Sequence, residues 1–213
     1  MILLSFLWMG IVLTANAQKD PKAEEILNSV SEKYQSLNGL SATFEYTYFN
    51  AQEGANQTNT GEVSIKGDMY KLVLDDQEIY NNGETVWTYI KSNNFKEVTI
   101  SSVDKNMEEL TPSNIYNIYK KGYNYQLLGE RTQDGKAVEE ILLTAENKKN
   151  QFQKIKLIID KNNKDLLGWE IEDDMGGVFS YRFKEIDSKV NIPDSYFVFD
   201  KQKHPDVEVI DLR

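Results

Sequence analysis

Hydrophobic and polar residues follow two different periods along this chain, and the first of them is helical. Over residues 21–37 the apolar side chains recur at spacings of three and four, at Ala23, Ile26, Leu27, Val30, Tyr34 and Leu37. This spacing places them on one face of an α-helix. Asp20 and Pro21 form a typical helix start, because Asp accepts free backbone N–H groups and Pro has no N–H to leave unpaired. Asn38 and Gly39 then predict the end of this amphipathic helix.

From residue 41 onward the period changes to two, which is typical of half-buried strands. A polar stretch at residues 50–60 interrupts the alternation and is predicted to be a loop. Residues 196–199 are apolar enough to form a last short strand. The other strands are predicted at residues 41–49, 62–66, 70–75, 78–80, 85–89, 95–100, 123–129, 138–145, 152–160, 166–172 and 178–183.

Glycine-containing dipeptides mark two of the turns between these strands. Asn82 with Gly83, and Asp134 with Gly135, are typical of two-residue type I′ hairpin turns, which need positive φ at both central positions. A run of about eleven strands joined by short turns predicts a mainly β (α+β) fold. We expect an incomplete antiparallel β-barrel, or one large curved sheet, with an N-terminal helix.

The middle of the chain breaks the strand pattern with two predicted short helices. Residues 104–110 can form the first helix, and Thr111 with Pro112 starts the second, which Gly122 ends. Each helix has only one apolar face, which is the pattern expected of a lid over an open sheet. The predicted lid residues are Met107, Leu110, Ile115, Ile118 and Tyr119.

The N-terminus is predicted to be a secretory signal peptide covering residues 1–17. Residues 2–13 are apolar but too short to span a bilayer, and Ala15 and Ala17 frame a small-residue cleavage site. Residues 18–213 would then form a single domain with a sizeable core. The chain has no cysteine, so no lipid anchor can be attached after the signal, and we expect a soluble periplasmic or secreted protein.

The composition of the chain argues against most classes of catalytic, metal-binding and nucleic-acid-binding site. The formal net charge of −10 argues against binding to nucleic acid or to an anionic membrane. One histidine, His204, and no thiol cannot build a hydrolytic triad or a histidine-rich metal site. His204 lies in a polar tail and is expected at the surface. No phosphate loop or dinucleotide fingerprint occurs, so we expect no cofactor, no metal and no enzymatic activity.

Two groups of acidic residues leave alternatives open. Residues 160–165 (DKNNKD) resemble a calcium loop, but Lys164 occupies a ligand position, so a hairpin turn is favoured. The pairs Glu139–Glu140 and Asp173–Asp174 are adjacent in sequence and point to opposite faces if they lie in strands. A carboxylate hydrolase would need such groups set opposite each other across a cleft.

Several strands carry aromatic and aliphatic side chains that are predicted to share one face of the sheet. This face can be an ordinary core beneath the helix. It also offers more apolar positions than one helix and two short ones can cover, which favours a cavity for an apolar ligand. The predicted cavity residues are Phe44, Tyr46, Tyr48, Ile65, Tyr70, Leu72, Leu74, Trp87 and Tyr89.

The order of these segments resembles the LolA family of periplasmic outer-membrane lipoprotein carriers. After the signal peptide and helix come residues 40–44 (LSATF) and 61–66 (GEVSIK), and the chain ends with an FVF stretch at 197–199. Residues 82–89 (NGETVWTY) are similar to the family's Asp-Gly-Lys-Thr-Leu-Trp-x-Tyr segment. The resemblance covers essentially the whole predicted mature chain.

The resemblance implies a monomeric periplasmic carrier whose cavity holds the acyl chains of lipoproteins. Its implied partners are acylated lipoproteins, an inner-membrane lipoprotein-releasing ABC transporter, and an outer-membrane lipoprotein acceptor where one exists. One departure concerns the lid. Family members carry an Arg-Pro after the second strand, and the Arg holds the lid; here residues 66–68 (KGD) take that place, with Tyr70 at a family aromatic position near the mouth. The lid must therefore be held in another way or be less tightly gated.

Two other functions remain as alternatives. A protein of the same fold could sense mislocalised lipoproteins and signal through a protein contact, although no second domain is predicted. A carboxylate hydrolase is the other alternative, and it requires turnover that is lost on substitution of Glu or Asp.

Overall fold

The computed structural model describes residues 19–213, apart from residues 53, 92–94, 105–109 and 174. The predicted signal peptide and residues 105–109 of the first predicted lid helix, Met107 included, lie outside the described residues. Helix and strand bounds are α1 (Pro21–Gln35), β1 (Leu40–Asn50), β2 (Ala55–Lys66), β3 (Met69–Val73), β4 (Gln77–Asn81), β5 (Thr85–Lys91), β6 (Lys96–Ser102), η1 (Ile115–Lys120), β7 (Tyr123–Gln133), β8 (Lys136–Ala145), β9 (Lys154–Asp160), β10 (Leu166–Glu172), β11 (Val178–Asp187), η2 (Asp194–Phe197), η3 (Lys201–Lys203) and β12 (Glu208–Asp211).

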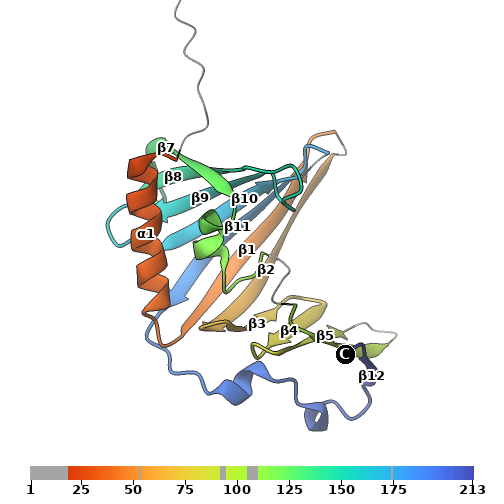
Figure 1. Ribbon diagram of the computed structural model, residues 1–213. Helices are drawn as coiled ribbons and strands as arrows, with labels where there is room; N and C mark the ends of the chain where they lie inside the picture. The colour runs from red at the N-terminus through yellow and green to blue at the C-terminus, as the bar shows by residue number, and fades with distance from the viewer. Residues whose placement is uncertain (1–18, 53, 92–94, 105–109, 174) are drawn as a thin grey trace, which may run out of the picture.

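All twelve described strands belong to one sheet in the order β12-β6-β5-β4-β3-β2-β1-β11-β10-β9-β8-β7. Its edge strands, β12 and β7, do not pair with each other among the described residues, so the barrel is incomplete, as predicted. Every neighbouring pair is antiparallel except β12 with β6, which is parallel. Figure 1 shows α1 along one side of the long strands, and the C-terminal segment, residues 188–212, passing beside β3 to β5.

Helix α1 is fixed to the sheet at its first turn and along its apolar face. The Asp20 carboxylate accepts hydrogen bonds from the backbone N–H groups of Lys22 (2.9 Å) and Leu127 (3.0 Å), so one side chain caps the helix and joins it to β7. The Leu127 N–H is the main reason that the pKa of Asp20 lies below its usual value. The helix core residues pack with strands β7 to β10 in a cluster that includes Ala23, Leu27, Val30, Ile141, Leu143, Ile155, Leu157 and Ile159. We call the side of the sheet that carries this cluster the helix face.

Strand β2 begins earlier than predicted, and the predicted loop at 50–60 is wrong for most of its length. Strand pairing between β1 and β2 continues to Asn50 opposite Ala55. Polar residues can extend a strand where backbone pairing and side-chain contacts suffice, and the Thr47 and Thr58 hydroxyls lie 3.0 Å apart on adjacent strands. The long β1–β2 hairpin thus projects beyond the core.

The two predicted type I′ turns have different outcomes. Asp134 and Gly135 have φ of 51° and 75° between the paired residues Gln133 and Lys136, as a type I′ turn requires. At the other site the Asn82 N–H donates to the Thr85 carbonyl (3.2 Å), and among Asn82 and its neighbours only Gly83 has positive φ. The loop is therefore shifted by one residue, because the Asn82 side chain accepts the Glu84 and Thr85 N–H groups.

Two further predictions are corrected near the middle and the end of the chain. The second predicted lid helix is a 3₁₀-helix, η1, that starts at Ile115 and not at Pro112. The predicted strand at residues 196–199 is wrong, since η2 covers Asp194–Phe197 and the last strand is β12. Phe197 is fully buried, so this apolar run serves as packing for the C-terminal segment.

Candidate functional site

A largely apolar cavity of about 240 Å³ opens on the helix face beside the part that α1 covers. Its walls come from strands β1, β2, β3, β10 and β11, and from the β3–β4, β6–η1 and β8–β9 connections. Among the described lining residues, Thr111 alone is neither aliphatic nor aromatic. The lining residues are Phe44, Tyr46, Val63, Leu72, Leu74, Leu110, Thr111, Pro112, Phe152, Trp169, Ile171, Tyr181 and Phe183.

Strand register explains why these side chains meet. Residues that pair across adjacent antiparallel strands point to the same face of the sheet. Tyr46 pairs with Tyr181 on β11, and Tyr181 pairs in turn with Trp169 on β10. On the other side of β1, Val63 of β2 pairs with Leu72 of β3. Alternation along each strand then repeats the pattern two residues away, so five strands build one apolar surface.

Aromatic rings form the floor of the cavity. The Trp169 and Tyr181 rings are stacked with centroids 4.9 Å apart, and Tyr46 stacks on Tyr181 at 6.3 Å. Phe44 contacts both Tyr46 and Tyr181 at 6.0 and 6.4 Å. Burial raises the pKa of the Tyr46 and Tyr181 hydroxyls, which is the mark of a surface from which water is partly excluded. The rings therefore form a continuous, poorly hydrated row across three strands.

Gly61 makes room for this arrangement. A Cβ atom at this position would lie 2.5 Å from the tip of the Phe44 ring and 2.9 Å from a methyl of Leu74. Phe44 is paired with Gly61 across the β1–β2 ladder, so its ring can lie over the glycine backbone. Because Gly61 has no side chain, the Phe44 ring can lie close to β2, and this determines the position of the cavity wall.

Six predicted cavity residues lie in or beside the cavity. Phe44, Tyr46, Leu72 and Leu74 line it. Ile65 and Tyr70 are buried in the adjoining cluster with Leu40 and Ala42, and they are not among the lining residues.

Tyr48 is on the same face but lies farther along β1, toward the hairpin tip. Its ring contacts Phe179 at 4.6 Å, and its hydroxyl donates to Asp173 (3.3 Å). Tyr48 therefore belongs to a polar-edged contact beyond the cavity.

Trp87 and Tyr89 lie on the opposite face of the sheet, which corrects the prediction that they share a face with Leu72. Leu72 pairs with Ile79 on β4, whereas Trp87 pairs with Tyr80. Strands β4 and β5 carry apolar residues on both faces, so alternation alone cannot assign the inward side.

The C-terminal segment explains why β4 to β6 are apolar on the face away from the cavity. Phe199 packs against Tyr80 (5.7 Å) and Tyr89 (5.3 Å), and Val207 joins the same buried cluster. His204, which was expected at the surface, is half-buried and stacks on Phe199 at 5.1 Å. The segment is a strap that covers the face away from the cavity.

The predicted lid residues separate into two groups. Leu110, with Thr111 and Pro112, lines the cavity. Ile115, Ile118 and Tyr119 are buried against α1 and strands β7 to β9, where they form part of the core.

Hydrogen bonds hold the segment that follows Leu110. The Ser31 hydroxyl donates to the Asn117 side chain (2.6 Å) and the Tyr119 hydroxyl to Asn28 (2.6 Å), so η1 is tied to α1. Ser113 donates to the Asp68 carbonyl (3.4 Å), in the turn where the resemblance places the family's Arg-Pro. Lys66 of that turn binds Asp194 (2.7 Å) and so holds the C-terminal segment.

Sequence reasoning missed half of the cavity wall. Val63, Trp169, Ile171, Tyr181 and Phe183 all lie in predicted strands with the right alternation. The pattern could have found them, but only strand order reveals that β11 lies next to β1. Phe152, predicted as the first residue of a strand, lies in the connection before β9, and Pro112, predicted to start a helix, lies in the connection before η1.

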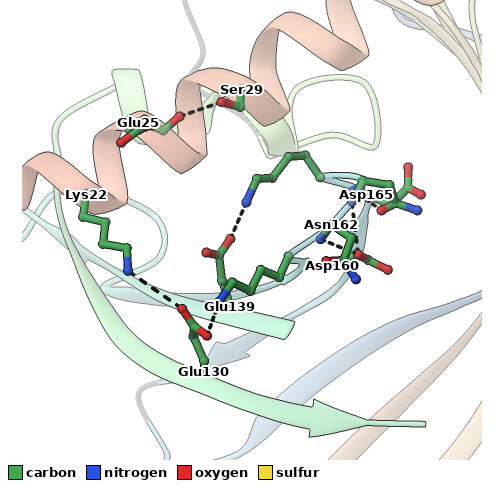
Figure 2. Close-up of polar contacts among 11 residues, drawn as sticks. Lys22, Glu25, Ser29, Glu130, Glu139, Asp160, Asn162 and Asp165 are labelled. Atoms are coloured by element: carbon green, nitrogen blue, oxygen red, sulfur yellow. Dashed lines mark hydrogen bonds and ion pairs between the residues drawn. The ribbon is translucent and has the colours of Figure 1, made fainter. Parts of the chain in front are cut away.

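The acidic groups near α1 form ion pairs and turn contacts (Figure 2). Glu139 is 3% exposed and pairs with Lys164 at 2.7 Å. The Asp160 carboxylate accepts the Asn162 and Asn163 N–H groups, so residues 160–165 form the hairpin turn that the sequence favoured. No group of three or more potential metal ligands occurs within the part of the chain that the structure describes.

Comparison with known proteins points to one family. The model of the family "Outer membrane lipoprotein carrier protein LolA" matches residues 13–166. No match was found among curated protein sequences. In the described part of the chain, no helix has the length and apolar character needed to cross a membrane.

A solved structure shows the same fold. An uncharacterized conserved protein from Thermus thermophilus has a TM-score of 0.60 at 18% identity, covering 89% of this chain and 99% of that one. Two others are more distant. A LolA superfamily protein from Nitrosomonas europaea has a TM-score of 0.46 at 16% identity, with coverage of 84% and 98%. LprF from Mycobacterium bovis has a TM-score of 0.48 at 16% identity, with coverage of 83% and 98%.

Proposed function

This chain belongs to the family of the outer membrane lipoprotein carrier protein LolA, and on this premise we propose that it shelters the acyl chains of lipoproteins and carries them from the inner to the outer membrane. The observation that carries the proposal is the apolar cavity on the helix face. An acyl chain gains about 0.8 kcal/mol for each methylene group that leaves water. A carrier therefore needs an apolar cavity whose walls are poorly hydrated. The row of Phe44, Tyr46, Tyr181 and Trp169 forms such a wall.

The cavity is small, which supports a mechanism in which one wall moves outward when an acyl chain binds. Its volume of about 240 Å³ is just below the range of roughly 300–1,000 Å³ that is typical of small-molecule sites. Residues 110–112 belong to no helix or strand and line the opening. Outward movement of this connection enlarges the hollow without breaking a strand pair, whereas the core under η1 keeps the following residues in place.

The rest of the proposal concerns location and partners. Residues 1–17 act as the export signal, and residues 18–213 work as one monomeric domain in the periplasm. The carrier receives acylated lipoproteins from an inner-membrane ABC transporter and passes them to an outer-membrane acceptor. It needs no cofactor of its own, because transfer requires only that the acceptor bind the acyl chains more favourably.

The test is binding of a fluorescent acyl probe to the purified protein and to two neighbouring variants. Leu72→Gln places an amide in the cavity wall, and we expect probe affinity to fall about tenfold, since an unpaired amide costs on the order of 1–3 kcal/mol in an apolar site. Val73→Gln is the matched control, because Val73 lies between Leu72 and Leu74 on the opposite face. Equal probe affinity in both variants would contradict the cavity assignment.

Depletion in the source cell tests the transport step. Lipoproteins should accumulate in the inner membrane when the protein is removed, and fractionation of the two membranes measures this. If they reach the outer membrane normally while the protein captures a signalling partner, the sensor alternative is favoured and transport is contradicted.

A further inference from the structure

Two tyrosine hydroxyls give the cavity a polar corner. Tyr46 and Tyr181 are neighbours on β1 and β11, and both line the cavity. Among the described residues neither hydroxyl has a hydrogen-bond partner, whereas the hydroxyls of Tyr34, Tyr48 and Tyr119 all form hydrogen bonds. The other polar side chain among the described lining residues, Thr111, has its hydroxyl 3.1 Å from that of Ser113. A few polar groups in a mainly apolar hollow are the feature that orients a ligand in small-molecule sites.

An acidic turn lies next to this corner. Asp75 and Asp76 follow directly after the lining residue Leu74 and are the two central residues of the β3–β4 turn, closed by the Leu74 N–H to the Gln77 carbonyl (2.8 Å). Both side chains are exposed, and no hydrogen bond or ion pair to either carboxylate is found among the described residues. The rim beside the two hydroxyls therefore carries two carboxylates without an ion pair of their own. The ammonium group of Lys91, which donates to the Leu74 carbonyl (3.3 Å), is paired with Glu78 (3.3 Å).

Electrostatics connect the turn with the corner. Burial is the main cause of the raised pKa of Tyr46, and the charges of Asp75 and Asp76 raise it further. Burial and the neighbouring Tyr46 raise the pKa of Tyr181. Both phenols therefore stay neutral at physiological pH and can donate hydrogen bonds, while the field at the rim opposes any additional negative charge.

Resting on the proposed function, we infer that the cavity selects acyl chains whose head is a neutral hydrogen-bond acceptor, an ester or amide carbonyl, and rejects free fatty-acid anions. The hydroxyls of Tyr46 and Tyr181 donate to the carbonyl oxygen. Asp75 and Asp76 repel a carboxylate at the same place. A carrier with this corner distinguishes lipid-modified protein from the fatty acids released by lipid breakdown, although both offer the same hydrocarbon tail.

Cavity volume sets the choice of probe. A methylene group is close in size to a water molecule, whose share of liquid volume is about 30 Å³, so about 240 Å³ holds a chain of medium length. Methyl decanoate and decanoate share a tail of eight methylene groups and differ in the charge of the head and in the ester methyl group. Their affinities are measured by competition against the fluorescent acyl probe at neutral pH and low salt, since salt screens exposed charges.

We expect the wild-type protein to bind methyl decanoate about tenfold more tightly than decanoate, the size of one modest charge repulsion near solvent. In Asp75→Asn/Asp76→Asn the affinity for decanoate should rise until the two ligands differ by less than about threefold. Asp134→Asn/Glu84→Gln removes the same charge from two distant turns and should keep the wild-type ratio. In Tyr46→Phe/Tyr181→Phe the affinity for the ester should fall several-fold, while binding of decane stays unchanged.

The outcomes separate the two claims. If decanoate binds as tightly as its ester in the wild type, or if the Asp75/Asp76 variant keeps the full preference for the ester, the inference is overturned and the carrier function stands. If neither ligand nor the acyl probe binds at all, the cavity assignment itself fails and both claims fall. Thermal unfolding of each variant confirms that the folded protein was compared.

Discussion

The helix face of this sheet contains two regions whose side chains are packed differently. Under α1 and η1 the strands present aliphatic residues, and Ile141, Leu143, Ile155 and Ile159 have no exposed surface. Beside them, strands β1, β10 and β11 present rings, and Tyr46, Trp169 and Tyr181 are only half-buried. Branched aliphatic side chains interdigitate with a helix and leave no space. Stiff rings that stack on each other are supported by their neighbours and can border an open hollow.

The difference explains why a cavity can persist in a stable protein. The packed region supplies the free energy of folding, and the aromatic region can leave part of its surface uncovered. The sequence leaves open whether this face forms a packed core or an open cavity. The structure has both on the same face, with the packed core under α1 and η1 and the cavity beside it.

The largest expected effect comes from truncating one leucine in each region. Leu143→Ala should lower the free energy of unfolding by about 2–5 kcal/mol, since a cavity opens in a close-packed core. Leu72→Ala should cost no more than about 1 kcal/mol, because Leu72 already borders a hollow. Urea denaturation measures both. Equal losses would mean that the two regions are packed alike.

Two glycine-to-alanine substitutions sharpen the comparison, because one adds a methyl group against backbone atoms and the other adds it against side chains. At Gly168 a Cβ would lie 2.2 Å from the Tyr181 carbonyl oxygen, which is backbone and cannot rotate away, so Gly168→Ala should destabilise by roughly 1–3 kcal/mol or more. At Gly61 the nearest atoms belong to the Phe44 and Leu74 side chains, which can swing into the cavity. Gly61→Ala should therefore weaken acyl-probe binding several-fold with a smaller change in denaturation midpoint; the reverse pattern would contradict this account.

The smallest expected effect concerns the cap that fixes α1 over its region. The folded-state pKa of Asp20 is below its usual value, so its carboxylate contributes stability above the unfolded-state pKa of about 3.9, and this is lost as pH falls through the folded-state pKa. Asp20→Asn keeps a capping oxygen and should cost less than about 1 kcal/mol at neutral pH. The gap between wild type and variant should shrink as the pH is lowered from about 5 to about 3 in denaturation experiments. A gap that widens would show that the charge of Asp20 does not stabilise the helix.

Local patterns predicted the elements well, and long-range pairing decided the rest. Helix α1 and most strands follow from capping residues and alternation, because these signals act over a few neighbouring residues. Trp87 was assigned to the wrong face, since only the C-terminal segment reveals why β5 is apolar on both sides. Tyr181 was missed as a wall residue because the pairing of β11 with β1 joins distant parts of the chain.

The cavity wall is completed late in synthesis, because it needs β11, which lies far along the chain from β1. Phe44 and Tyr46 meet Phe183 and Tyr181 only when β11 docks on β1, a non-local pairing that forms slowly because a long intervening chain must first be ordered. A polypeptide that has emerged only as far as β10 offers half a wall to solvent. Under the proposed function, an acyl chain can therefore be held only after β11 has docked on β1.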